Sequence, residues 1–141
     1  MPTEFIVTPQ EIETCCQGQL HPLAVSGLEL FNAGEFFEAH EALELAWREE
    51  QGPVRELYRG ILQIAVAYLH ILRGNYTGAV KMFIRSRTWL GPFPDTCRGI
   101  DLKRFRQDYQ RVETLLLASG PRGLELIDRS LMKPIHLEDK Q

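Results

Sequence analysis

The chain has 141 residues, of which 44% are hydrophobic, 25% charged and 9% aromatic. These proportions are those of an ordinary soluble domain, and they exclude a disordered chain, which would bury too little apolar surface to offset its ordering entropy. The length predicts a single domain, residues 1–141, because single domains usually have ~100–150 residues. The net charge of −3 includes no large basic excess, so a nucleic-acid partner is not expected.

We expect neither a secretory signal nor a membrane span from the sequence. The N-terminus, residues 1–4, lacks the basic region and apolar stretch of a secretory signal. The most apolar segment, residues 61–72, is shorter than the ~20 residues that span a bilayer, and it contains Gln63 and His70. We therefore expect a soluble, cytoplasmic protein with no membrane partner.

The three cysteines are Cys15, Cys16 and Cys97. Their odd number, the adjacent pair and the missing CxxC spacing are not typical of a disulfide framework or a zinc ribbon. We expect reduced cysteines that are packed as small side chains, because free cysteine is commonly buried.

Capping and turn residues divide the chain into helices. Thr8, Pro9 and Glu11 form a capping box with proline at the first helical position, which predicts a helix from there to about Gln17. By the same reasoning, further helices are expected from 22 to a stop at 32–34, from 35 to 50, from 53 to 73, from 76 to 90, and from 101 to a stop at 120–121.

No alternating run of β-branched residues is present, so the fold class is all-α: a compact bundle of about five to six helices. The helix over 53–73 is apolar almost all round and is expected at the centre of the bundle. After the last long helix we expect a short helical turn and a loose C-terminal tail of about 132–141.

A faint internal repeat relates residues 34–39 to residues 74–79, a shift of 40 positions. Each copy contains a glycine turn, an aromatic residue, and then an alanine, Ala39 or Ala79, where two helices must approach closely. The pattern resembles the second helix of a tetratricopeptide repeat, although that repeat has ~34 residues and a solenoid usually needs ~3 copies. We expect antiparallel helical hairpins closed into a bundle, with tetratricopeptide-like packing locally.

Polar residues interrupt the apolar side of the helix over 35–50. Helical spacing places His40 and Glu44 one turn apart, inside or at the edge of the apolar arc that includes Trp47. Both side chains are therefore expected to be at least partly buried, whereas Glu38 should be a surface charge.

On the helix over 53–73, one polar line recurs at spacings of 4, 4 and 7 residues: Arg55, Arg59, Gln63 and His70. A buried carboxylate needs a partner, because an unpaired charge in a dry site is unfavourable. We therefore predict one connected polar cluster between the two helices, made of His40, Glu41, Glu44, Gln63 and either Arg59 or His70.

Three interpretations of this cluster stay open: a structural network that docks the two helices, a metal site, or a ligand or catalytic pocket with His40 or Glu44 as acid or base. His40-Glu41-x-x-Glu44 is not the HExxH zinc motif, and the Glu-x-x-His pair of di-iron bundles is missing. No cofactor is therefore expected, with a divalent metal as the alternative.

No complete set of catalytic residues can be identified in the sequence. This favours a non-enzymatic helical interaction or scaffold protein that binds a protein or peptide. The alternative is a small hydrolase-like or metal-dependent enzyme that uses His40, Glu41 and Glu44. A homo-oligomer is compatible with both. The basic residues that cluster in the second half are expected on solvated helix faces, with an anionic partner or RNA as the alternative: Arg85, Arg87, Lys103, Arg104, Arg106 and Arg111.

A longer motif resembles a known family, the domain of unknown function 309. It reads Phe31-Asn32-x-Gly34-x-Phe36-Phe37-Glu38-x-His40-Glu41-x-Leu43-Glu44-x-x-Trp47, followed by Gly60-x-x-Gln63-x-Ala65 and Gly74-Asn75-x-x-Gly78-Ala79. The match runs from about 28 to 90, nearly half of the chain. The resemblance implies a small, intracellular, all-helical protein that stands alone, and it implies no assigned activity, substrate or cofactor.

Overall fold

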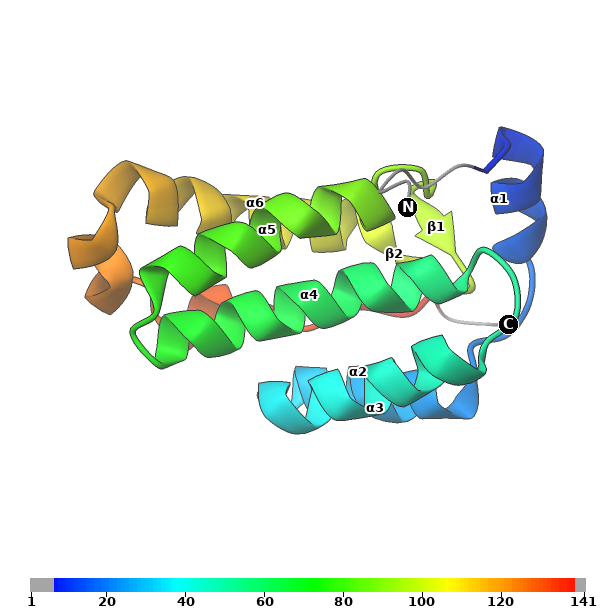
Figure 1. The fold of residues 1–141 in the computed structure, drawn as a ribbon, viewed down its shortest axis with the longest axis horizontal. Helices are drawn as coiled ribbons and strands as arrows, with labels where there is room; N and C mark the ends of the chain where they lie inside the picture. The colour runs from blue at the N-terminus through cyan, green and yellow to red at the C-terminus, as the bar shows by residue number, and fades with distance from the viewer. Residues whose placement is uncertain (1–6, 139–141) are drawn as a thin grey trace.

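Six α-helices and one two-stranded hairpin make up residues 7–138, the part of the chain that the computed structural model describes (Figure 1). The elements are α1 (Pro9–Cys15), α2 (Pro22–Asn32), α3 (Phe36–Glu49), α4 (Arg55–Leu72), α5 (Tyr76–Leu90), β1 (Thr96–Cys97), β2 (Ile100–Asp101), α6 (Leu102–Ser119) and the 3-10 helices η1 (Pro121–Leu126) and η2 (Arg129–Leu131). The all-α class is confirmed. None of the described helices combines the length and the apolar character that crossing a bilayer demands.

Local chemistry sets the helix ends close to where the sequence predicts them. The Thr8 hydroxyl accepts a hydrogen bond from the Glu11 N–H at 3.1 Å, while the Glu11 carboxylate accepts one from the Thr8 N–H at 3.2 Å. At the starts of α5 and α6, Asn75 and Asp101 accept hydrogen bonds from backbone N–H groups three residues further on. The first helix ends two residues earlier than predicted, at Cys15.

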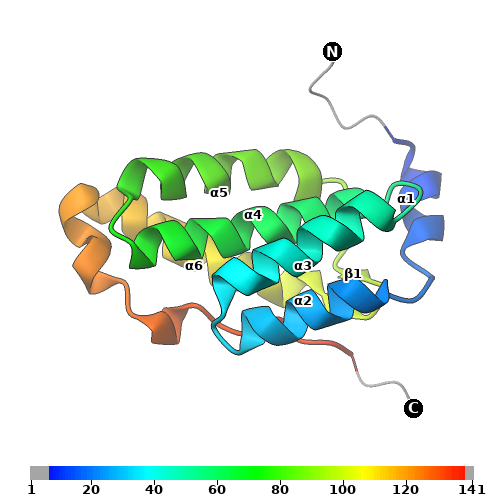
Figure 2. The same ribbon diagram turned by 60° about the horizontal axis from the view of Figure 1, so that its bottom comes forward.

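Helix α4 lies between α3 and α5, and α2 packs on α3 (Figures 1 and 2). Ile61 and Ile64 of α4 are completely buried and Leu69 is half-buried, which agrees with the central place predicted for this helix. Helix α6 closes the other side of the core through aromatic rings. Its Phe105 meets Phe31 of α2 with ring centroids 6.0 Å apart.

Close approach between helices requires small residues at two positions. A Cβ on Gly60 would lie 2.4 Å from Cγ of Leu90, and a Cβ on Gly27 would lie 2.7 Å from Cγ of Leu43. A side chain at either glycine would therefore push two helices apart. The tetratricopeptide-like character of the hairpins stays a prediction.

The expectation of reduced cysteines is wrong in the structure. Cys16, at the end of α1, forms a disulfide with Cys97 of β1, 81 residues away in the sequence, and Cys15 is the free thiol. The pairing depends on the hairpin, which turns at Arg98 and Gly99, both with positive φ. A hairpin with two-residue strands has no alternating pattern, so it could not be predicted from periodicity.

The loose tail predicted for 132–141 is wrong over 132–138. Ile135 is buried, and its N–H and C=O groups both hydrogen-bond the side chain of Asn32, at 2.7 and 2.9 Å. Leu137 forms a bridge with Ile100, which adds the segment to the edge of the hairpin. Residues 139–141 lie outside the described part of the chain. Arg106, expected on a solvated face, is half-buried and donates to the carbonyls of Leu90 and Phe93.

Candidate functional site

The solvent side of α3 carries a pocket of about 260 Å³, here called the α3 pocket. The helix buries Phe36, Ala39, Leu43 and Ala46, a pattern that turns the intervening residues outward. The pocket is lined by residues from this outer side: His40, Glu41, Glu44, Leu45 and Arg48. It therefore combines both signs of charge with an exposed leucine.

The contacts of Glu44 are local. Its carboxylate accepts a hydrogen bond from the Arg48 guanidinium at 2.6 Å and lies 3.5 Å from Nε2 of His40. Glu44 keeps 36% of its side chain exposed and His40 keeps 28%. Ion pairs one turn apart on an exposed helix are worth only about 0.3–0.5 kcal/mol. Partial burial of both residues agrees with the sequence, and Glu38 is exposed, as expected.

The single cluster predicted between α3 and α4 does not form in the described residues. Both partners of Glu44 belong to α3, whereas Arg59 pairs with Glu56 at 3.4 Å and His70 lies 3.3 Å from the Asn75 amide. The physical reason is the position of Glu44 at the edge of the apolar arc. Water reaches its carboxylate there, so no desolvation penalty forces it to find a donor on α4.

Gln63 is the remaining member of the predicted cluster. Its Oε1 atom is buried and has no hydrogen-bond partner within residues 7–138. Glu41 is exposed and makes no hydrogen bond or ion pair with any described residue. The structure thus brings together His40, Glu41 and Glu44 in one pocket, and leaves Arg59, Gln63 and His70 outside it.

Arg59 instead takes part in a stack that sequence reasoning missed. Its guanidinium carbon lies 4.7 Å from the ring centroid of Trp47 on α3 and 4.0 Å from that of Trp89 on α5. The indole N–H of Trp47 donates to Glu56 Oε1 at 2.8 Å. Arg55 covers the same indole at 4.5 Å and donates to the Trp47 carbonyl at 3.1 Å. We call these five residues the tryptophan–arginine stack.

The stack fixes both neighbouring helices to the N-terminal half of α4. Each cation–π contact contributes about 0.5–2 kcal/mol, more where the cation is desolvated. Glu56 is only 8% exposed, and its buried carboxylate is satisfied by the Arg59 guanidinium and the Trp47 indole N–H. The sequence signal was present, since both tryptophans of the chain and an Arg-x-x-x-Arg spacing take part. The sequence alone cannot show which residues of three different helices lie in contact.

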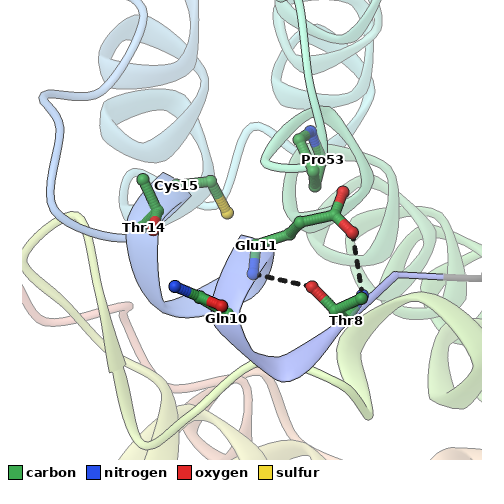
Figure 3. A pocket seen from close by; sticks show the side chains of 6 residues that line it. All are labelled: Thr8, Gln10, Glu11, Thr14, Cys15 and Pro53. Atoms are coloured by element: carbon green, nitrogen blue, oxygen red, sulfur yellow. Dashed lines mark hydrogen bonds between the residues drawn. The ribbon is translucent and has the colours of Figure 1, made fainter.

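A second pocket, of about 410 Å³, lies between α1 and the loop before α4 (Figure 3). It is lined by Thr8, Gln10, Glu11, Thr14, Cys15 and Pro53. Burial raises the pKa of the Cys15 thiol, against a smaller lowering by Arg98. A raised pKa keeps the thiol protonated near neutral pH and makes it a poor nucleophile. Glu11 is already engaged with Thr8 in the capping box, so the pocket offers no activated group.

Arg98 organises the polar contacts beside this second pocket. Its guanidinium donates to the carbonyls of Cys15 and Gln19, each at 2.6 Å, and pairs with Glu50 at 3.0 Å. Tyr58 donates its hydroxyl to Glu50 at 2.9 Å. Within residues 7–138, no three side chains of His, Cys, Asp or Glu lie together in a way that could hold a metal ion.

Comparisons with known proteins concern the middle of the chain. Residues 25–82 match the family model described as "Domain of unknown function (DUF309)", so the resemblance inferred from the motif is confirmed. An uncharacterized protein of Aquifex aeolicus (strain VF5) is 29% identical over 85 residues, which are 58% of this chain and 25% of that protein. The uncharacterized protein YpuF of Bacillus subtilis (strain 168) is 37% identical over 60 residues, 42% of this chain and 34% of its own.

The chain thus spans only a quarter to a third of the length of these two relatives. The family segment contains the α3 pocket and most of the tryptophan–arginine stack. Trp89 and all three cysteines lie outside it.

Proposed function

We propose that this chain, whose residues 25–82 match the model of a family without an assigned activity, is a non-enzymatic protein-binding module. The binding surface is the outward side of three neighbouring helices, here called the three-helix face. It is marked by Glu41 and Trp47 of α3, Arg59 and Val66 of α4, and Arg85 and Trp89 of α5.

One observation carries this proposal: α3 presents large apolar side chains to solvent in and beside a charged pocket. Leu45 is 47% exposed and lines the α3 pocket, and Phe37, 43% exposed, precedes the pocket on the same helix. Exposed apolar groups bordered by charges are typical of surfaces that bind other proteins.

Both ends of the three-helix face are held rigidly. This favours binding, because little conformational entropy is lost on association. The tryptophan–arginine stack fixes one end, where Arg59 lies between the two indoles. At the other end, the Arg73 guanidinium lies 5.9 Å from the ring centroid of Phe37.

The alternative function, a small hydrolase-like or metal-dependent enzyme, rests on the His40–Glu44 pair in the α3 pocket, 3.5 Å apart. A pair of this kind can move a proton. However, the other lining residues are Glu41, Leu45 and Arg48, which supply no hydroxyl or thiol nucleophile. Elemental analysis of protein purified without chelator tests the metal version. Near-stoichiometric zinc, iron or manganese that His40→Ala abolishes would favour the enzyme.

Site-specific photo-crosslinking in cells tests the binding proposal. A photoreactive amino acid replaces Glu41 in one variant and Gln110, an exposed residue of α6, in a matched control. We expect discrete adducts with another polypeptide, either a second copy or a different protein, from position 41 and not from position 110. Identical adduct patterns at both positions, or none at either, would contradict the proposal.

The cytoplasmic location expected from the sequence is part of the proposal. The family resemblance supports it, whereas the Cys16–Cys97 disulfide is of a kind that is rare in reducing compartments. Alkylating the free thiols in intact cells before mass analysis tests the location. Three alkylated cysteines would support the cytoplasm, and a fully retained disulfide would contradict it.

A further inference from the structure

We propose that the partner of the three-helix face is a second copy of this chain, related to the first by a two-fold axis that lies between the two faces and runs parallel to α4. This inference rests on the proposed function, because it names the partner of that same face. Charge, helix direction and the apolar residues at the centre of the face support it.

Charge is distributed unequally along the chain. Residues 7–75 contain ten acidic and four basic side chains, whereas residues 76–138 contain seven acidic and eleven basic ones. The contrast is sharpest between α3, which has four glutamates and one arginine, and α5, which has three basic residues and no acidic one. Since these two helices lie on either side of α4, the face is acidic along one edge and basic along the other (Figure 2).

The charges that point outward lack partners within the copy. Glu41 on α3, and Lys81 and Arg85 on α5, are exposed and make no hydrogen bond or ion pair among residues 7–138. By contrast, Glu44 is paired with Arg48, and Arg87 with Glu113 on α6. The unpaired charges are therefore available to a second molecule on this face.

Helix direction makes the two edges complementary in a closed dimer. Short turns connect α3 to α4 and α4 to α5, so α3 and α5 both run opposite to α4 and parallel to each other (Figure 1). A two-fold axis that lies in the interface, parallel to α4, places α3 of each copy over α5 of the other in the same direction. Residues at the same level along α4 then face each other, and this level is set by Trp47 and Trp89, which both contact Arg59. Glu41 lies near the middle of α3, and Lys81 and Arg85 lie near the middle of α5. The opposite charges therefore meet twice, once on each side of the axis.

The centre of the face is partly apolar. Leu62, Val66 and Leu69 of α4 are half-buried and line the strip between the charged edges, beside the half-buried polar residues Gln63 and His70. Apolar groups inside a charged rim are usual in protein interfaces. An 18-residue helix is ~27 Å long, and three helices ~8–10 Å apart cover ~25 Å, so each copy contributes roughly 600 Å². The total of roughly 1,200 Å² reaches the lower end of the range for specific interfaces.

Analytical ultracentrifugation of the full chain tests the proposal with charge-reversal variants. We expect the wild-type chain to sediment with twice its own mass, and added salt to weaken the dimer. Glu41→Lys alone, and Lys81→Glu with Arg85→Glu, should each raise the dissociation constant at least ~10-fold, because like charges then face each other on both sides of the axis. Matched charge reversals away from the face, Glu29→Lys on α2 and Arg111→Glu on α6, should leave it within ~3-fold of wild type.

Mixing the variants gives the decisive measurement. When Glu41→Lys is combined with the Lys81→Glu/Arg85→Glu double variant, both charge contacts become attractive again, and a one-to-one dimer should return to within ~3-fold of the wild-type affinity. A wild-type chain that stays monomeric at ~100 μM, far above the dissociation constants of specific interfaces, would overturn the proposal. So would a dimer that ignores these substitutions, or a mixture that does not reassociate. Photo-adducts at position 41 with a different protein, from a chain that stays monomeric, would retain the proposed function and remove this inference alone.

Discussion

The junction between α1 and the β hairpin and the layer of α3, α4 and α5 are held together by different physical forces. In α1, Ile12 is the buried residue, and the helix is tied to the rest of the molecule by the Cys16–Cys97 disulfide and the hydrogen bonds of Arg98. In α4, by contrast, Ile61 and Ile64 are completely inaccessible to solvent. The junction depends on a covalent bond and polar contacts, whereas the layer depends on apolar burial.

The difference shows which helices of a small protein can keep one side exposed to solvent without losing their position. A helix such as α4, buried on one side, still presents Arg59 and Val66 on the other without losing its place. A short helix such as α1 has too little apolar surface to hold its position, so its stability depends on a few specific links. Each of the following predictions removes one type of link.

Loss of the disulfide should have the largest effect. Replacing both Cys16 and Cys97 by serine should lower the free energy of unfolding by about 4 kcal/mol, because the disulfide restricts an 81-residue loop in the unfolded chain. Amide hydrogens of α1 should lose their protection from exchange, while those of α4 keep it. Cys15→Ser is the matched control and should change stability by less than ~0.5 kcal/mol. An unchanged unfolding curve for the double variant would mean that α1 does not depend on the disulfide.

The tryptophan–arginine stack provides the corresponding test inside the layer. Glu56→Ala should lower the free energy of unfolding by about 2 kcal/mol, because the Trp47 indole N–H and the Arg59 guanidinium lose a buried acceptor. Denaturant unfolding followed by tryptophan fluorescence measures the change directly. Glu49→Ala, which removes an exposed carboxylate, should change it by less than ~0.5 kcal/mol. Equal effects of the two substitutions would contradict a structural role for the stack.

The contrast between the two regions also explains what the sequence could predict. The helices of the layer follow from apolar periodicity and from local caps such as Asn75 and Asp101, so their bounds were predicted to within about two residues. The disulfide and the tryptophan–arginine stack join positions far apart in the sequence, and no local pattern encodes such pairs. For the α3 pocket, periodicity gave the partial burial of His40 and Glu44 correctly. Periodicity could not show that the Glu44 carboxylate pairs with Arg48, one turn away on the same helix.

Alkaline pH should weaken the junction through a smaller effect. Burial raises the pKa of Tyr58 to about 12 from a usual value of 10, and its hydrogen bond to Glu50 acts in the same direction, against a lowering by the His21 N–H. Between pH 10 and about 12 the unfolded chain loses this proton while the folded chain keeps it, so the free energy of unfolding should fall as the pH rises through that range. Denaturant unfolding below pH 10 and near pH 12 measures this decrease. It should be smaller in Tyr58→Phe, and an equal decrease in that variant would assign it to Tyr68 and Tyr109, whose pKa values burial also raises.

Glu44→Ala should have the smallest effect, and it separates the observed α3 pocket from the connected cluster that the sequence predicted. Removing a carboxylate that is buried and paired between two helices would lower the free energy of unfolding by about 3–5 kcal/mol. Glu44 keeps 36% of its side chain exposed and pairs only within α3 among the described residues, so the expected loss is below ~1 kcal/mol. Arg48→Ala is the matched control, because it removes the other half of the same ion pair. A decrease above ~3 kcal/mol in the free energy of unfolding for Glu44→Ala, without a similar decrease for Arg48→Ala, would show that the Glu44 carboxylate contacts α4 and stabilises the packing of α3 on α4.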